Sequence, residues 1–447
     1  MSGTPGPSLM ARLDDVEPRV RAGALRELSG LVRARAIEVE PETDLVNMHC
    51  HTFFSFNAYG HSPSALAWLG RQHGLRAMGI VDMDVLHGVD EFLDACELLG
   101  MRGSAGIEAR VFLPEYATEE INSPGEPGVC YHMGIGLTGS SVPQDAALDL
   151  EDLARRVHMR NREMVRRINE CLNPVRVDYR RDVLPLTPSG HPTERHLVVA
   201  YLRAAERTVA DPAAFWAGAL EADREEVAGM LPERPALQSM IRARLMKRGG
   251  VGHVAPTATS FPSLDAFHRL IKACGALPCA AWLDGTSPVE RRIEEWLGWL
   301  VDRGVVALNL IPDRNWNVAD PTVRRRRVDS LYRVVELAQE MDLPLHIGTE
   351  MNSFGQRMVD DLAAAELLPL RQAFLDGAFF VVGHTALQRA AGLGYQSEWA
   401  GSRLPARRVR NEFYTQVGQK VPPGREGRAL VARLKPDMSP REVLAEL

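Results

Sequence analysis

The sequence predicts an α/β protein built on a parallel sheet or barrel. From residue 45 onward, short apolar segments alternate with helical stretches, which is the pattern of parallel α/β folds. The chain has 447 residues, of which 45% are hydrophobic and 25% charged, enough for two domains or one large barrel. The net charge of -6 argues against a general nucleic-acid-binding protein.

The predicted strands are short and apolar, and most are followed by a turn or a helix start. Eight are expected, at residues 45–51, 77–82, 105–112, 130–137, 276–282, 305–311, 343–349 and 379–384. A charged, helical stretch separates the fourth from the fifth. We therefore expect an N-terminal helical extension at 1–43, a barrel domain at 44–400 with a helical insertion at about 145–247, and a C-terminal extension at 401–447.

The composition excludes several other classes. No apolar run approaches the ~20 residues that cross a bilayer, and the first residues lack the apolar core of a secretory signal. The six cysteines are scattered without a C-x-x-C pair, which argues against a disulfide framework or a cysteine zinc site. We expect a cytoplasmic protein with neither a membrane nor a nucleic acid as its partner.

Polar residues stand at the ends of the predicted strands, where the active sites of parallel barrels lie. The first strand ends in His49-Cys50-His51, and strand alternation puts both imidazoles on one face. Histidine nitrogens and carboxylates together are typical ligands of a divalent transition metal, which lowers the pKa of its bound water. The residues at the other strand ends are Asp82, Asp84, Glu108, His132 and Glu350.

Each of these residues also has a structural interpretation when it is taken alone. An isolated H-x-H pair arises by chance, His132 could be a hydrogen-bonded core histidine, and Glu108 could belong to an ion pair. Asp82 and Asp84 could cap the next helix. The metal site is inferred from their joint occurrence at successive strand ends.

These motifs resemble the PHP (polymerase and histidinol phosphatase) superfamily over residues 45 to about 355. The resemblance implies a distorted (β/α)7-type barrel that hydrolyses phosphate esters with a cluster of up to three metal ions. The segments that carry it are 44–52 (DLVNMHCHT), 81–83 (VDM), 106–108 (GIE), 132–136 (HMGIG), 192–197 (PTERHL), 277–282 (LPCAAW) and 348–352 (GTEMN).

Several positions depart from the family pattern. Met83, Trp282 and Asn352 stand where the family has histidines, and Asn57 stands where many relatives have His or Asp. The resemblance implies a second metal site at Glu108 and His132 that lacks its third ligand. It implies one complete metal site, formed by His49, His51, Glu108 and Glu350. Further candidate ligands are His61, Asn57, Asn352 and His384.

The leading hypothesis is a metal-dependent hydrolase of a small phosphate ester, with Zn, Mn or Fe as the metal. In it, Asp82 orients water or a ligand histidine, and His132 serves the second ion. Arg110 and Arg314 each contact the phosphate or pair with a structural carboxylate. The absent ligands suggest an alternative, a PHP-like protein that binds metal or ligand without turnover. A third hypothesis is an amidohydrolase-like barrel that cleaves C–N bonds, against which stands the lack of a strand-end lysine. The oligomeric state is not predicted.

Overall fold

A distorted barrel of seven strands forms the centre of the molecule. This computed structural model describes residues 7–232 and 234–447, so the start of the predicted N-terminal extension, residues 1–6, lies outside the described residues. The strands follow one another around the sheet in chain order. They are β1 (Val46–Cys50), β2 (Ala77–Met83), β3 (Gly103–Phe112), β4 (Val129–Leu137), β5 (Leu277–Trp282), β6 (Ala307–Leu310) and β7 (Leu345–Ile347).

The first seven predicted strands are confirmed, and the barrel closes between the first and the last. Cys50 and Glu350 form a parallel bridge. The His51 amide donates to the Glu350 carbonyl at 2.8 Å, and the Glu350 amide donates to the His49 carbonyl at 2.8 Å. These bonds join the end of β1 to the segment after β7, so the residues that close the barrel are also the predicted site residues.

One strand of the barrel runs against all the others. β4 is antiparallel to both β3 and β5, whereas the other neighbouring pairs are parallel. The start of β4 therefore lies at the same end of the barrel as the ends of the other strands. We call this end the mouth and the opposite end the floor.

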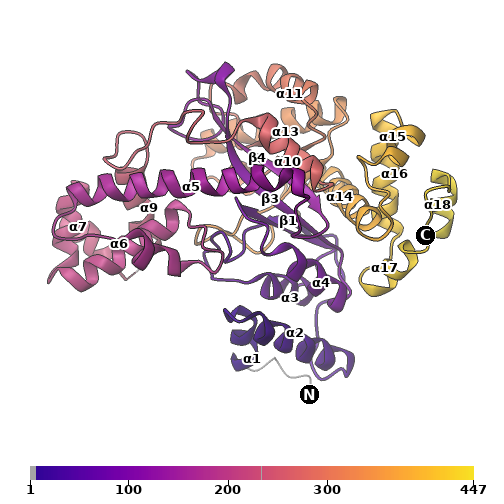
Figure 1. Cartoon of the computed structure of the whole chain (residues 1–447), viewed down its shortest axis with the longest axis horizontal. Coiled ribbons are helices and arrows are strands. Elements are labelled where there is room, and N and C mark those ends of the chain that lie inside the picture. The colour runs from indigo at the N-terminus through magenta and orange to yellow at the C-terminus, as the bar shows by residue number, and fades with distance from the viewer. Residues whose placement is uncertain (1–6, 233) are drawn as a thin grey trace.

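Helices surround the barrel and continue beyond it on three sides (Figure 1). The part of the chain that the structure describes contains no helix long and apolar enough to cross a membrane. The helices are α1 (Pro7–Ala11), α2 (Pro18–Arg33), α3 (Pro63–Gln72), α4 (Val89–Leu99), α5 (Gln144–Cys171), α6 (Glu194–Thr208), α7 (Pro212–Leu220), α8 (Arg224–Met230), α9 (Arg234–Ile241), α10 (Leu264–Ala273), α11 (Ile293–Asp302), α12 (Asp313–Trp316), α13 (Pro321–Glu340), α14 (Arg371–Ala391), α15 (Glu398–Arg403), α16 (Arg407–Lys420), α17 (Arg425–Val431) and α18 (Pro440–Glu446).

The helical insertion begins at the floor and returns to the mouth along α5. This helix has 28 residues, which at 1.5 Å per residue is about 42 Å. Figure 1 shows it as one continuous helix from the sheet to the helices α6, α7 and α9. Its first half packs into the barrel core through Ala146 and Leu153, and its second half packs into a separate apolar cluster that extends from Met164 to Met246.

The eighth predicted strand, 379–384, is wrong, because these residues lie within α14. The helix is buried from Phe374 to Leu387 at most positions, so its sequence lacks the polar face that marks an amphipathic helix. It packs beneath the barrel floor. A Cβ on Gly377 would lie 1.8 Å from the carbonyl oxygen of Leu345, at the start of β7. Only glycine, which has no Cβ, allows the helix to lie this close to the strand backbone.

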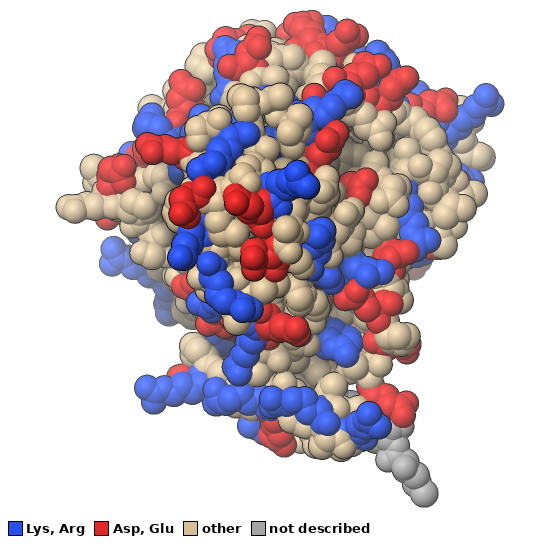
Figure 2. Space-filling view, turned by 90° about the vertical axis from the view of Figure 1, so that its right-hand side faces the viewer, with Lys and Arg blue, Asp and Glu red and all other residues tan. Residues whose placement is uncertain are grey.

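The two terminal extensions pack against the outside of the barrel. Arg21 of α2 is buried, and its Nε donates to the Glu91 carboxylate of α4 at 2.8 Å. At the other end, α15 to α18 lie beside α14 (Figure 1). Most of the face that they form carries basic and acidic side chains next to one another (Figure 2).

Candidate metal centre

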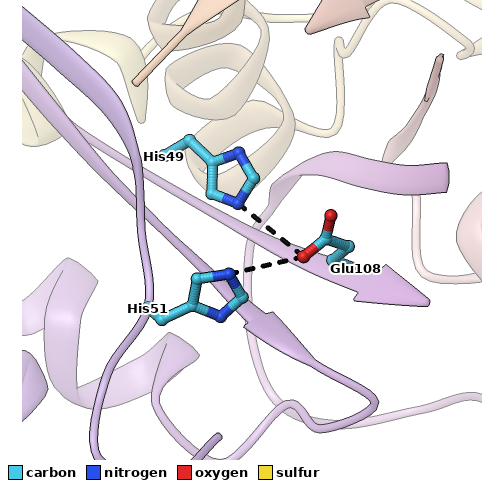
Figure 3. A group of neighbouring side chains, drawn as sticks. All are labelled: His49, His51 and Glu108. Carbon is cyan, nitrogen blue, oxygen red and sulfur yellow. Dashed lines mark ion pairs between the residues drawn. The ribbon is translucent and has the colours of Figure 1, made fainter. Parts of the chain in front are cut away.

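Two histidines and a glutamate converge at the barrel mouth. His49 and His51 come from the end of β1, and Glu108 comes from β3. Their ligand atoms all lie within 4.8 Å of one another. The Glu108 Oε2 is 3.9 Å from His49 Nε2 and 3.4 Å from His51 Nε2. Figure 3 marks both contacts with dashed lines. The three residues are at most 4% exposed.

A serine and an aspartate orient His51. The Ser55 hydroxyl donates to the Asp82 carboxylate at 2.6 Å, so its oxygen is left to accept the N–H of His51 Nδ1, 3.0 Å away. Asp82 is fixed in turn by the amide of Thr52 at 2.8 Å and its hydroxyl at 2.7 Å. This chain of bonds places the proton of a neutral His51 on Nδ1 and leaves the lone pair on Nε2.

An asparagine does the same for His49. The Asn309 carbonyl oxygen lies 3.2 Å from His49 Nδ1 and 3.0 Å from His346 Nδ1. Because this oxygen only accepts hydrogen bonds, His49 also carries its proton on Nδ1. Both Nε2 atoms are buried without a hydrogen-bond partner.

This arrangement fits a divalent metal ion. Buried lone pairs without a donor are costly in a folded protein, and two such nitrogens beside one carboxylate form a typical N/O ligand set. Burial lowers the pKa of His49, which keeps the ring in the neutral form that binds metal. Burial acts in the same direction on His51, but the adjacent Glu108 carboxylate raises the pKa of His51 above its ordinary value.

The predicted fourth ligand, Glu350, lies in the same cavity but has other partners. Its carboxylate accepts from Arg314 at 3.1 Å and from the Gln356 amide at 3.2 Å. Burial opposes ionisation of Glu350, yet Arg314 and the two histidines hold its pKa at about 2. The residue has a φ of 62°, so its backbone turns sharply where it closes the barrel.

His132 lies outside the cluster because of the direction and register of β4. It pairs with Ala109 across β3 and β4, whereas its neighbours Met133 and Tyr131 pair with Glu108 and Arg110. Paired residues point to the same face of a sheet, so His132 points outward. There its Nε2 lies 2.8 Å from the Nε2 of His268, on α10.

Trp282 does not line the cavity either, although its two neighbours in the chain, Ala281 and Leu283, do. Neither it nor His132 therefore contributes a ligand to a second metal site. Met83, in contrast, does line the cavity, with a thioether where the family has an imidazole.

The remaining predicted residues divide between the cavity and the surrounding loops. Arg110 lines the cavity and pairs with Glu126 at 2.7 Å and Glu194 at 3.3 Å. Asn352 also lines it, with its amide oxygen 3.2 Å from Arg195 Nη2.

Three of the further candidates have structural partners instead. The Asn57 amide donates to the carbonyl of His51 at 2.8 Å. The His61 Nδ1 lies 3.1 Å from an Asp14 carboxylate oxygen. His384 lies on α14 at the barrel floor, where its Nδ1 accepts the amide of Tyr395 at 3.0 Å.

A cavity of about 480 Å³ contains the cluster, and the insertion forms much of its wall. Seven basic residues and four acidic residues line the cavity. Of the seven basic residues, the sequence predicted a role in the site only for Arg110 and Arg314. The others belong to the insertion, where a charged helix gave no sign of facing a cavity. The seven are Arg110, Arg160, Arg195, Arg242, Lys247, Arg248 and Arg314, and the acidic residues are Asp84, Glu108, Glu194 and Glu350.

The fold and the cluster together define a barrel with a buried candidate metal centre at its mouth. No family model matches the chain, and no curated protein sequence matches it. Among solved structures, it resembles an amidohydrolase from Chromobacterium violaceum with bound sulfate and no metal, with a TM-score of 0.50 and 14% identity over 74% of this chain and 96% of the other. It also resembles a proposed metal-dependent phosphoesterase from Bifidobacterium adolescentis, with a TM-score of 0.47 and 19% identity over 74% of this chain and 98% of the other. Likeness at this level of identity concerns the fold.

Proposed function

We propose that the protein is a metal-dependent hydrolase of small phosphate esters and a divergent member of the PHP superfamily. The observation that carries this proposal is the pair of buried, unpartnered Nε2 atoms of His49 and His51 beside Glu108. The excess of basic side chains around the cavity favours an anionic substrate over a neutral amide.

The residues of the cluster have separate roles in this function. His49, His51 and Glu108 would hold the ion, which supplies an activated water molecule and a positive charge next to the scissile phosphate. Ser55 and Asp82 act through the His51 ring, which they hold in place, so they are positioning residues. Arg110, already fixed by Glu126 and Glu194, is aligned to neutralise charge on the phosphoryl oxygens.

Glu350 has a different part in this proposal. Its bond to Arg314 keeps a second guanidinium in the cavity, and its backbone fixes the strand that carries the histidines. Only three ligands are clustered in the described chain, so the remaining coordination positions are open to water and substrate, as in catalytic metal sites.

Metal analysis combined with a phosphatase screen tests the proposal. Purified wild-type protein should contain about one metal per chain and hydrolyse at least one phosphomonoester, and His49→Ala should lose both properties. Ser55→Ala should keep the fold but bind the metal about 10- to 100-fold more weakly in a chelator competition. His61→Ala is the matched control, because this histidine bonds Asp14 outside the cavity.

The outcomes separate the alternatives. Bound metal that depends on His49, without hydrolysis of any phosphate ester, would indicate a metal-dependent binding protein. Hydrolysis of amides in place of phosphate esters would indicate the C–N hydrolase. A protein that takes up no metal under any condition would overturn the proposal.

A further inference from the structure

Two arginines of the insertion line the cavity without a carboxylate partner. Of the seven basic residues in the cavity wall, five form an ion pair within 4 Å, with Glu126, Glu194, Glu350 or Glu120. Arg160 of α5 and Arg195 of α6 form no such pair with any described residue. These two differ from the others in having no direct counter-ion, because the carboxylates that act on them, such as Asp84 and Glu350, do so from beyond ion-pair distance.

Arg160 is held firmly in place although its charge is unpaired. The residue is 7% exposed, and its Nη1 donates to the Ser260 carbonyl at 2.9 Å. Its guanidinium lies 4.4 Å from the ring centroid of Phe261. Its Nε is buried without a hydrogen-bond partner. Burial lowers the pKa of Arg160 to about 10, the direction expected for a cation without a counter-ion.

Arg195 is similarly positioned by neutral groups. Its Nη2 donates to the Ser353 hydroxyl at 2.6 Å and to the Asn352 amide oxygen at 3.2 Å. Burial lowers the pKa of Arg195 to about 10 as well. Asn161, next to Arg160, donates to the carbonyl of Pro192 at 2.5 Å. This bond ties α5 to the start of α6, so the segments that carry the two arginines lie side by side.

A cation that is buried, as Arg160 is, or half-buried, as Arg195 is, is unfavourable without a direct counter-ion. The cavity is within the size range of small-molecule sites, and it contains the metal cluster through His51 and Glu108. A guanidinium presents several donors in a plane that matches a phosphate or a carboxylate. The missing charge is therefore best supplied by a ligand that extends from the cluster towards the insertion.

We propose that Arg160 and Arg195 form an anion subsite, and that the substrate carries a second anionic group, a phosphate or a carboxylate, besides the phosphate at the metal cluster. This inference rests on the proposed function for the first group only. The second group is recognised by the insertion, which makes the insertion the specificity element of the site.

Ligand binding to the metal-loaded full-length protein tests the subsite without turnover. Calorimetry would compare methylphosphonate, with one anionic group, with 1,3-propanediphosphonate and phosphonoacetate, with two. The ligands with two groups should bind at least ~10-fold more tightly, and Arg160→Gln or Arg195→Gln should each remove ~10- to 100-fold of that advantage. The affinity for methylphosphonate should fall by much less than the affinity for the two-group ligands.

Three variants provide the controls. Arg166→Gln removes an exposed arginine from the same helix and should preserve the advantage. Arg160→Lys keeps the charge and should retain part of it, which separates lost charge from lost packing. Thermal melting checks that each variant is folded.

The results distinguish the subsite from the proposed function. If the diphosphonate loses more affinity than phosphonoacetate in the arginine variants, the second group is a phosphate; the reverse identifies a carboxylate. Arginine-dependent binding of both ligands in a protein that hydrolyses no phosphate ester would support the subsite and overturn only the function. Equal binding of one-group and two-group ligands by wild type, or an advantage that both Gln variants keep, would overturn the subsite.

Discussion

The metal centre shows how much a few side chains beyond the ligands determine. His49 and His51 were predicted from their alternation, and Glu108 from its place on the third predicted strand. Ser55 and Asn309, which set the tautomers of the two histidines, were not predicted. Ser55 lies in a loop whose path is fixed by Asp82, and no spacing rule shows which hydroxyl a ring will meet.

Another buried histidine makes the free energy of unfolding depend on pH. His196 is 4% exposed, and its Nδ1 accepts the amide of Thr193 at 3.0 Å at the start of α6. Burial lowers the pKa of His196 to about 3, whereas the unfolded chain has a pKa of about 6.5. The fold therefore favours the neutral ring, so its contribution is complete above pH ~6.5 and is lost as the pH falls from there towards 3.

At pH 5, the titration of His196 alone should lower the free energy of unfolding by about 2 kcal/mol. Urea denaturation at pH 7.5 and pH 5 would measure the loss for wild type and for His196→Gln, whose side chain can still accept the Thr193 amide. The variant should lose about 2 kcal/mol less than wild type over this interval. The same pH dependence in both proteins would show that His196 is not the responsible group.

At the scale of elements, the register of β4 against β3 explains the largest difference between the predicted and the observed site. The composition of residues 130–137 identifies a strand but carries no information about which residues of β3 it pairs with. The residue that points into the mouth is Tyr131, and His132 points towards α10. The segment 130–137 was thus predicted correctly as a strand, but His132 points away from the metal centre for which it was predicted.

α14 presents the opposite case, in which the burial of residues was evident but their conformation was not. An apolar segment of six residues is compatible with a buried strand or with part of a buried helix. The segment forms part of a helix that packs across the barrel floor. The sequence does not show that the other elements leave this floor uncovered.

The packing of α14 gives a test by substitution. Gly377→Ala would place a methyl group 1.8 Å from the Leu345 carbonyl oxygen, which is backbone and cannot turn away. We expect it to destabilise the protein by about 1–3 kcal/mol or more. Gly218→Ala, in the exposed part of α7 with no atom within 4 Å, should instead stabilise it by up to about 1 kcal/mol. Urea denaturation measures both, and a stable Gly377→Ala would contradict the close approach of helix and strand.

At the scale of the whole molecule, the described part of the chain contains two apolar clusters joined by one helix. The barrel cluster includes both terminal extensions, and the second cluster belongs to the insertion. Because α5 contributes to both, the insertion is tied to the barrel by a rigid element. The sequence indicated a helical insertion at about 145–247, but its separate core depends on contacts between residues far apart in the chain.

This division predicts that the insertion unfolds more easily than the barrel. Native-state hydrogen exchange should show the amides of α6 to α9 exchanging together, at a lower free energy of opening than those of β1 to β3. The reason is that the cluster of the insertion is much smaller than that of the barrel. Exchange of both regions at the same free energy would show that they form one cooperative unit.

The position of α14 beneath the barrel determines the route by which ligands reach and leave the metal centre. Since α14 closes the floor of the described barrel, whatever reaches the metal centre arrives through the mouth and departs by the same route. Under the proposed function, the phosphate released by hydrolysis leaves past the arginines that attracted the substrate. We therefore expect the released phosphate and the incoming substrate to share one route and to meet the same basic side chains of the cavity wall.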